Sequence, residues 1–262
     1  MKKLLFIPRA IIDLLSIWNK PLTIKEKSSL TYTIFILKIK KWLRKTDSVI
    51  SYKLFGYKLK GCNNESLQFL IKEIFIDKIY NLGKAFNNDH LKIIDIGSNI
   101  GLSVLFFKKY FRNAVIHAYE PNESSFELLR QNVERNNFSN VHLFQTAIAN
   151  NDGVFYPEEG FNPCSVNQRF SVQENNNKPV RCLRLTNLLQ SDNIDCVKMD
   201  IEGSETDVLT NVINNNCLTK VCCWLIEFHK DGEQTDWMKE EFLKQGYVYT
   251  RKKEVYCFKQ KE

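Results

Sequence analysis

The sequence predicts an α/β fold: a mostly parallel sheet with helices on both faces, a C-terminal antiparallel hairpin and a helical N-terminal extension. From Lys92 onward, short apolar runs alternate with amphipathic segments of helical spacing, a rhythm typical of parallel strands joined by crossover helices. The last two apolar runs, "GYVYT" and "EVYCFK", are close enough in sequence to favour a hairpin. The 262 residues, 44% of them hydrophobic, suffice for one such domain with an added subdomain.

The N-terminal extension is expected over 1–88, where helical spacing of apolar residues is interrupted once by strand-like alternation. The expected elements are a helix from Pro8, a helix over 28–45, a β-ribbon over 50–60 that turns near Gly56, and a helix over 67–79 with Ser66 as its cap. The α/β domain is then expected over 89–262.

Positive charge is concentrated at the start of the chain. Residues 1–60 contain 14 Lys and Arg against 3 Asp and Glu, a net charge of +11, whereas the whole chain carries +7 and the remainder therefore −4. A basic region of this kind suits a membrane surface, a nucleic acid or an acidic partner, and it is equally compatible with a solvated basic face. The first residues lack the cleavage site of a signal peptide, and no apolar run is long enough to span a membrane. We therefore expect a cytoplasmic protein with peripheral membrane contact as an option.

The eight cysteines show no CxxC spacing, which argues against a zinc site. Several lie in apolar, strand-like runs. We expect them to be free, buried thiols in a reducing compartment.

Within 89–262 the strands and helices are expected in alternation. The expected strands are "LKIIDIG", "AVIHAYE", "VHLFQTAIA", "IDCVKMD" and "KVCCWLIEF", and the expected helices are "LSVLFFKKYF", 122–136, a helix from Ser204 and one over 233–245. The polar segment 150–180 interrupts the alternation and is expected to be an insertion on the substrate side of the sheet.

The first candidate site lies at the ends of the first two strands. Asp95 and the glycines Gly97 and Gly101 join a strand to a helix, and such a loop lets a ligand approach the backbone and the helix N-terminus. The next strand ends in Glu120, where a carboxylate can accept hydrogen bonds from both hydroxyls of a ribose. The GxGxxG pattern of dinucleotide sites is absent. A ligand with an adenosine and a cationic end, such as S-adenosylmethionine, satisfies both carboxylates better than NAD does.

The segments "DIGSNIGLSVLFF", "AYEPNESSFELLRQNVERNN", "NVHLFQTAIANNDG" and "DCVKMDIEGSETDVL" resemble the FkbM-type methyltransferases, a branch of the Rossmann-like class I methyltransferases. The resemblance covers about residues 92–230 and implies the class I methyltransferase sheet and S-adenosylmethionine as cofactor. The cofactor-binding residues it implies are Asp95, Gly97, Asn99 and Gly101 for the methionine part, Glu120 for the ribose and Ala147 for the adenine, with Ser98 and Pro121 as further cofactor-binding residues. One departure is Asn187, which stands where the family often has the Asp of a "TLD" triplet.

The second candidate site lies at the ends of the fourth and fifth strands. Transfer of a methyl group to a hydroxyl requires a base, a metal ion or both to remove the proton. The candidate catalytic residues are Lys198, Asp200, Glu202 and His229. The metal question is open, with Asp200, Glu227 and His229 as candidate ligands of a divalent cation.

Structural explanations compete with some of these assignments. Lys198 can pair with Asp200 or Glu202 instead of acting in catalysis. The pattern from Ser204 to Asp207 fits a capping box, so that Glu205 is expected to be structural.

Three functions follow as hypotheses. The first is an O-methyltransferase acting on a hydroxyl of a small molecule, sugar or glycan precursor, as the resemblance implies, with a role in surface polysaccharide biosynthesis. The second is a nucleic-acid methyltransferase whose basic N-terminal arm contacts phosphates; it is disfavoured because "DIEG" replaces the Asp/Asn-Pro-Pro-aromatic motif of base-amino methylation. The third is a domain that binds the cofactor without chemistry.

Overall fold

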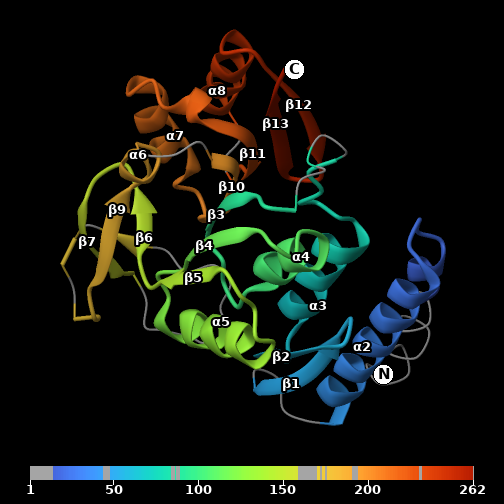
Figure 1. The fold of residues 1–262 in the computed structure, drawn as a ribbon. Helices are drawn as coiled ribbons and strands as arrows, with labels where there is room; N and C mark the ends of the chain where they lie inside the picture. Colours follow the sequence, from blue (N-terminus) through green and yellow to red (C-terminus); the bar gives the residue numbers. More distant parts are fainter. Residues whose placement is uncertain are drawn as a thin grey trace.

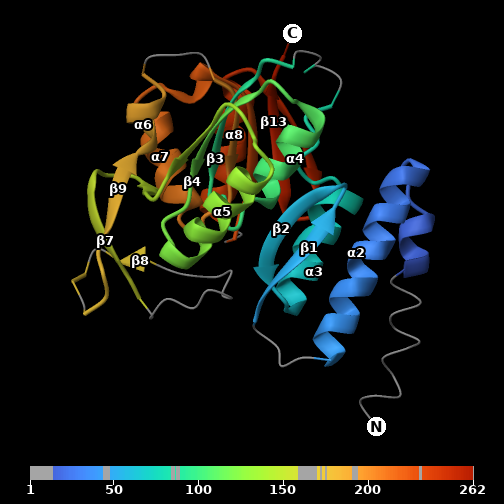
Figure 2. The ribbon, with the colours of Figure 1, turned by 60° about the horizontal axis from the view of Figure 1, so that its bottom comes forward.

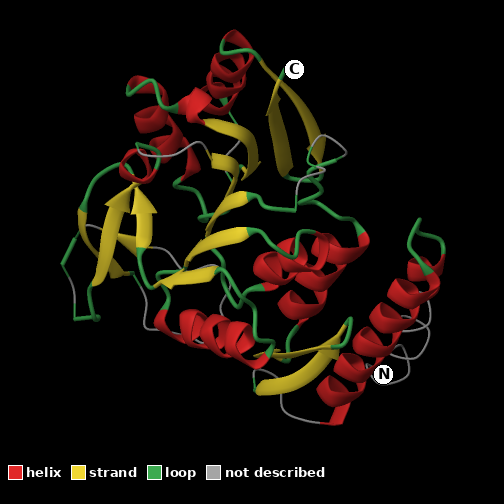
Figure 3. Ribbon diagram, viewed as in Figure 1, coloured by secondary structure: helices red, strands yellow, loops and turns green. Residues whose placement is uncertain are grey.

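A computed structural model describes residues 14–43, 48–83, 86, 89–158, 170–171, 173–174, 176–190, 194–229 and 232–261. Its centre is a seven-stranded sheet in the order β12-β13-β11-β10-β3-β4-β5 (Figures 1 and 3). The strands are β3 (Lys92–Ile96), β4 (Val115–Tyr119), β5 (Val141–Phe144), β10 (Ile194–Met199), β11 (Val221–Glu227), β12 (Tyr247–Lys252) and β13 (Val255–Gln260). The first five run parallel, and β12 and β13 form an antiparallel hairpin at one edge. The expected sheet and hairpin are confirmed.

Both faces of the sheet are buried, because successive side chains of each strand enter different hydrophobic clusters. Ile93 packs in a cluster with helices α4 and α5, and Ile94 packs in a second cluster with α7 and α8. This alternation follows from the two-residue period of a strand. The helices are α4 (Leu102–Tyr110), α5 (Glu123–Arg135), α6 (Leu185–Leu188), α7 (Glu205–Asn214), the short 3₁₀ turn Leu218–Lys220 and α8 (Glu233–Lys244). Helices α4, α5, α7 and α8 confirm the four expected helices, whereas α6 and the 3₁₀ turn were not expected.

The apolar run 141–149 is not a single strand, which corrects the sequence-based expectation. The chain turns after β5, where the backbone N–H of Thr146 donates to the carbonyl of Phe144 (3.0 Å). It then enters a second, four-stranded sheet in the order β6-β9-β7-β8. Its strands are β6 (Ala147–Ala149), β7 (Gly153–Pro157), β8 (Phe170–Ser171) and β9 (Val180–Arg184). The insertion over 150–180 therefore supplies two of the four strands, β7 and β8, of a small sheet beside the main one (Figure 1).

The N-terminal region contains α2 (Ile24–Leu43), β1 (Val49–Leu54), β2 (Tyr57–Cys62) and α3 (Glu65–Ile71), which continues as a π-helical turn over Lys72–Ile76. The ribbon and both later helices are thus confirmed, with shifted ends. The helix expected from Pro8 begins outside the described residues, and 14–18 are helical. The expected cap is wrong: Asn64, not Ser66, accepts the hydrogen bond from the backbone N–H of Leu67 (3.0 Å).

The N-terminal region is tied to the main domain through α5. The amide of Asn132 accepts from the backbone N–H of Lys60 (2.7 Å) and donates to the carbonyl of the same residue (2.9 Å). The same amide donates to the carbonyl of Ile100 in the loop before α4 (2.8 Å). A buried side chain thereby couples β2 to the glycine-containing loop.

The cysteines are not all free, which corrects another expectation. Cys62 is disulfide-bonded. The described free thiols are those of Cys182, Cys196, Cys217, Cys222, Cys223 and Cys257. Sequence spacing cannot reveal such a bond, because the two sulfurs meet only in the folded chain.

Candidate active site

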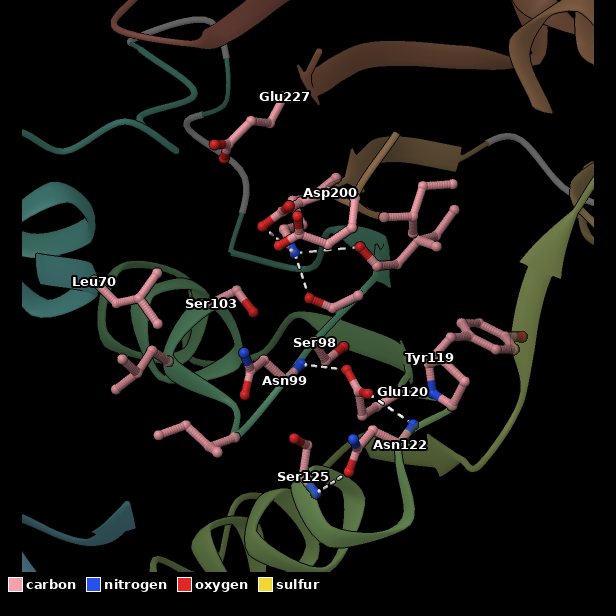
Figure 4. A pocket seen from close by; sticks show the side chains of 18 of the residues that line it. Leu70, Ser98, Asn99, Ser103, Tyr119, Glu120, Asn122, Ser125, Asp200 and Glu227 are labelled. Carbon is pink, nitrogen blue, oxygen red and sulfur yellow. Dashed lines mark hydrogen bonds and ion pairs between the residues drawn. The ribbon is translucent and has the colours of Figure 1, made fainter. Parts of the chain in front are cut away.

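A cavity of about 800 Å³ opens at the carboxyl ends of the parallel strands, which is where ligands bind in sheets of this kind. The loops after β3, β4, β10 and β11 form its floor, and Figure 4 shows their side chains converging on it. One wall comes from α3, through Phe69 and Leu70. The opposite wall includes Phe155 and Phe170 from the second sheet. Both the N-terminal extension and the insertion therefore shape this cavity.

The loop after β3 is held in a backbone conformation that only glycine adopts readily. Gly97 has φ +76°, and a Cβ there would lie 1.8 Å from the carbonyl oxygen of Asp200. Gly101, at the start of α4, has φ +88°, and a Cβ there would lie 2.7 Å from Leu129. The two glycines allow β3 to approach β10 and α4 to approach α5.

Glu120 joins the loops after β3 and β4. Its carboxylate accepts hydrogen bonds from the backbone N–H groups of Asn99 (2.8 Å) and Asn122 (2.8 Å), as Figure 4 shows. The residue is only 7% exposed, and burial raises the pKa of its carboxyl to about 7. Each carboxylate oxygen keeps a lone pair that can accept from a ligand hydroxyl.

Asp95 lies behind the cavity wall, fully buried. It accepts from the hydroxyl of Ser103 (2.6 Å), and its other oxygen lies 3.3 Å from the Nζ of Lys198. Lys198 also donates to the carbonyl of Gly97 (2.6 Å) and lies 3.6 Å from Asp200. Burial alone would lower the pKa of Lys198, but the carboxylates of Asp95 and Asp200 hold it above its usual value. Asp95 thus lies behind Lys198 and helps to keep its ammonium group charged.

His229 stands among four carboxylates. Its Nδ1 lies 2.7 Å from Glu205, and its Nε2 lies 3.5 Å from Glu202, 3.7 Å from Asp200 and 3.9 Å from Glu227. We call Asp200, Glu202 and Glu227 the acidic rim. Burial acts to lower the pKa of His229, but the hydrogen bond and charge of Glu205, with the rim carboxylates, raise it to about 9. Burial and the neighbouring Asp200 raise the pKa of Glu227 to about 8.

Glu205 is the residue of this site that the sequence did not point to. It is 1% exposed and accepts from the backbone N–H groups of Ile201 (3.1 Å) and Gly203 (3.1 Å). Burial acts to raise its pKa, but the hydrogen bonds from His229 and Gly203 lower it, so the carboxylate is ionised and Nδ1 of His229 is the donor. The expected capping box is wrong, because the side chain of Ser204 makes no cap hydrogen bond. The signal available in the sequence was Gly203. Its φ of +100° permits the turn that directs the backbone N–H groups of Ile201 and Gly203 toward the carboxylate of Glu205.

Asp200, Glu227 and His229 each offer one ligand atom, and these atoms lie within 4.8 Å of one another. Two carboxylate oxygens and one imidazole nitrogen are a donor set that suits a divalent cation such as Mn²⁺ or Mg²⁺. The contact of Glu205 with Nδ1 leaves Nε2 to face the other two ligands, the arrangement usual for metal-binding histidines. The donor chemistry therefore fits a cation at the rim.

The remaining predicted residues lie as follows: Ser98, Asn99, Pro121 and Ala147 line the cavity, and Gly101 does not. Asn187, where the family pattern often has an Asp, donates to Asp152 on the insertion (2.8 Å). It contributes to the attachment of the second sheet and does not reach the cavity wall.

The parallel sheet, its antiparallel hairpin, the glycine loop and the acidic end of the second strand define a Rossmann-like methyltransferase fold. The chain belongs to the Methyltransferase FkbM domain family, whose model matches residues 95–249. The family expected from the sequence is confirmed.

Three relatives show how far the similarity extends. "Methyltransferase 1" of Beauveria bassiana is 31% identical over an alignment of 168 positions, covering 55% of this chain and 66% of that protein. "31-O-demethyl-FK506 methyltransferase FkbM" of Streptomyces tacrolimicus is 26% identical, covering 60% of each chain. "Hexuronic acid methyltransferase AglP" of Haloferax volcanii is 26% identical, covering 54% of this chain and 57% of that protein. The matched region is thus less than two thirds of each relative.

Among solved structures, the methyltransferase FkbM from Methylobacillus flagellatus is similar at a TM-score of 0.49 and 14% identity. It covers 95% of this chain and 59% of that one.

Proposed function

We propose that this chain transfers a methyl group from S-adenosylmethionine to a hydroxyl group of a sugar or glycan precursor, as in surface polysaccharide biosynthesis. The observation that carries the proposal is that Glu120 and the glycine loop share one cavity with His229 and the acidic rim. A ligand site and a group of proton acceptors thus meet in one space. Two relatives are named for methyl transfer to an O-demethyl compound and to a hexuronic acid, and both names agree with oxygen as the acceptor atom.

The cofactor would lie along the ends of β3 and β4. Glu120 would accept hydrogen bonds from the ribose hydroxyls, and the backbone around Asn99, held by Glu120 and shaped by the glycines, would face the methionine part. Ala147 and Ile148, which line the cavity, would border the adenine. When bound, S-adenosylmethionine supplies an electrophilic methyl group, and the acceptor oxygen that takes it loses a proton. The negative charge of the acidic rim would favour the positively charged sulfonium of the cofactor at the end of the cavity away from the adenine.

The chain must then take up the proton of the acceptor hydroxyl. Asp200 and Glu202 are the groups placed to do so, whereas Lys198 holds Asp200 in position and stays charged. His229, either protonated or holding a cation at Nε2, would orient these carboxylates and would not itself accept the proton. Geometry rather than basicity distinguishes them, because the proton acceptor must lie within hydrogen-bond reach of the hydroxyl.

A divalent cation at Asp200, Glu227 and His229 forms part of the proposal. It would replace the proton on Nε2 of His229 and lower the pKa of a hydroxyl bound to it. Without it, the raised pKa of His229 keeps the ring protonated near neutral pH. The cation would thus offset the mutual repulsion of the rim carboxylates and give the methyl acceptor a place to bind.

The cavity wall favours a neutral acceptor. Glu65, Glu73 and Glu158 line the cavity in addition to the acidic rim, so an anionic acceptor meets like charge. Phe69, 56% exposed on the same wall, offers a flat apolar surface to a sugar ring. The same acidic lining disfavours a nucleic acid, whose affinity depends on basic contacts to phosphate.

The test is incubation with methyl-labelled S-adenosylmethionine and a panel of neutral sugars and glycans, with nucleotide sugars as the anionic comparison and EDTA in a parallel series. We expect label in a hydroxyl-bearing acceptor, and loss of transfer with EDTA that Mn²⁺ or Mg²⁺ restores. Asp200→Ala and His229→Ala should each reduce the rate by at least about a hundredfold, the lower end of general-base catalysis. Unchanged rates in both variants would show that the catalytic assignment is wrong, and transfer insensitive to EDTA would remove the metal from it.

A further inference from the structure

Helix α2 presents apolar side chains on two opposite faces. Leu30, Ile34 and Leu37 are fully buried against the N-terminal hairpin. The outward face carries large apolar residues with the following exposed fractions: Ile24 76%, Tyr32 61%, Phe35 47% and Trp42 56%. We call these four residues the outer face of α2. Large apolar side chains that remain exposed on the outward side of a helix, while its other side is buried, indicate an interaction surface.

The outer face lies at the edge of the molecule. In Figures 1 and 2, α2 stands apart from the central sheet, with β1 and β2 between them. Ile24, Phe35 and Trp42 follow the spacing that brings residues to one side of a helix. Trp18 extends this side, since its indole N–H donates to the hydroxyl of Thr31 (3.2 Å) and the residue is 45% exposed.

The charge around this face is complementary to an anionic surface. Residues 14–43 contain six lysines and one acidic residue, Glu26. Lys20 pairs with Asp77 and Lys41 with Glu65, whereas Lys25 is exposed at the start of α2. The net charge of 1–60 is +11, whereas that of the remaining residues is −4, so this end of the chain is the one that a negatively charged surface attracts most strongly. Tryptophan and tyrosine beside lysine are the residues that settle at the boundary between lipid headgroups and acyl chains.

We propose that the outer face of α2 docks on the surface of an anionic lipid bilayer. Among the described helices none is long and apolar enough to cross a membrane, so the contact is a surface one. The inference is independent of methyl transfer, because none of these residues lines the cavity.

The test is co-sedimentation of the full chain with vesicles of phosphatidylcholine alone and of phosphatidylcholine mixed with phosphatidylglycerol. We expect binding to the anionic vesicles only, weakened by salt. Trp42→Ser and Phe35→Ser should each weaken it about tenfold, and Lys25→Gln about fivefold. Trp237→Ser is the matched control, because Trp237 is an exposed aromatic (37%) on the distant helix α8.

Circular dichroism and S-adenosylmethionine binding, expected to be unchanged in all four variants, report on folding. Equal binding to both kinds of vesicle, or binding that Trp42→Ser leaves intact, would overturn the proposal. So would a dimer seen by sedimentation equilibrium that Trp42→Ser dissociates, since a second copy would then cover the face.

Discussion

The contact between Glu205 and His229 makes a sharp prediction for Glu205→Gln. The variant keeps the shape of the side chain but removes its charge, so the protonated form of His229 loses a charge-assisted hydrogen bond of 2.7 Å. Such a bond contributes about 1.5–3 kcal/mol, and 1.36 kcal/mol corresponds to about one pH unit. We therefore expect the pKa of His229 to fall from about 9 by about one to two pH units.

The assay is an NMR titration of the imidazole signals of the metal-free chain, with His229 identified among the four histidines by a His229→Gln variant. Asp207→Asn is the control, since Asp207 is exposed in the same helical turn. An unchanged pKa of His229 in Glu205→Gln, or an equal shift in Asp207→Asn, would refute the reasoning.

The same contact affects stability with a defined sign. The folded pKa of about 9 lies above the ordinary value of 6.5. The protonated ring therefore contributes stability that is fully present below pH 6.5 and lost as the pH rises through 9. The loss of unfolding free energy in Glu205→Gln should accordingly be larger at low pH than at high pH, as measured by urea denaturation.

Three further predictions concern the rest of the cavity. Gly97→Ala should abolish cofactor binding or folding, because its Cβ would lie 1.8 Å from a backbone oxygen; Gly56→Ala, also at positive φ but in open space, should cost only about 1–2 kcal/mol, as urea denaturation would show. Cofactor affinity measured by calorimetry should fall as the pH drops below about 7, because Glu120 then gains a proton; the same profile in Glu120→Gln would contradict this. Glu227→Gln should weaken Mn²⁺ binding at least about tenfold, whereas Glu73→Gln, outside the candidate ligands, should not; equal loss in both variants would exclude the proposed ligand set.

The order of strands and helices could be predicted because each has a distinct period. The alternation of Ile93 and Ile94 between two clusters shows why the parallel strands are apolar throughout. The break between β5 and β6 could not be predicted, because "VHLFQTAIA" is apolar on both sides of the turn. Pattern reveals which segments are buried, but not the sheet to which each belongs.

The sequence predicted which residues lie at the candidate site better than it predicted how they contact one another. The residues at the strand ends were found because parallel strands bring their carboxyl ends to one edge. The burial of Asp95 behind Lys198 was not, since β3 and β10 are neighbours only in the folded sheet. Glu205 was missed for the same reason: its partner His229 follows β11, and only the pairing of β10 with β11 brings them together.

The central claim is that methyl transfer to oxygen takes place between Glu120 and the acidic rim. The most direct measurement is NMR of the product formed from ¹³C-methyl S-adenosylmethionine and a neutral glycan acceptor. The account predicts a labelled methyl group on an acceptor oxygen, absent when Asp200→Asn and His229→Gln are combined. A labelled methyl group on nitrogen or carbon, or an undiminished O-methyl signal from the double variant, would contradict it.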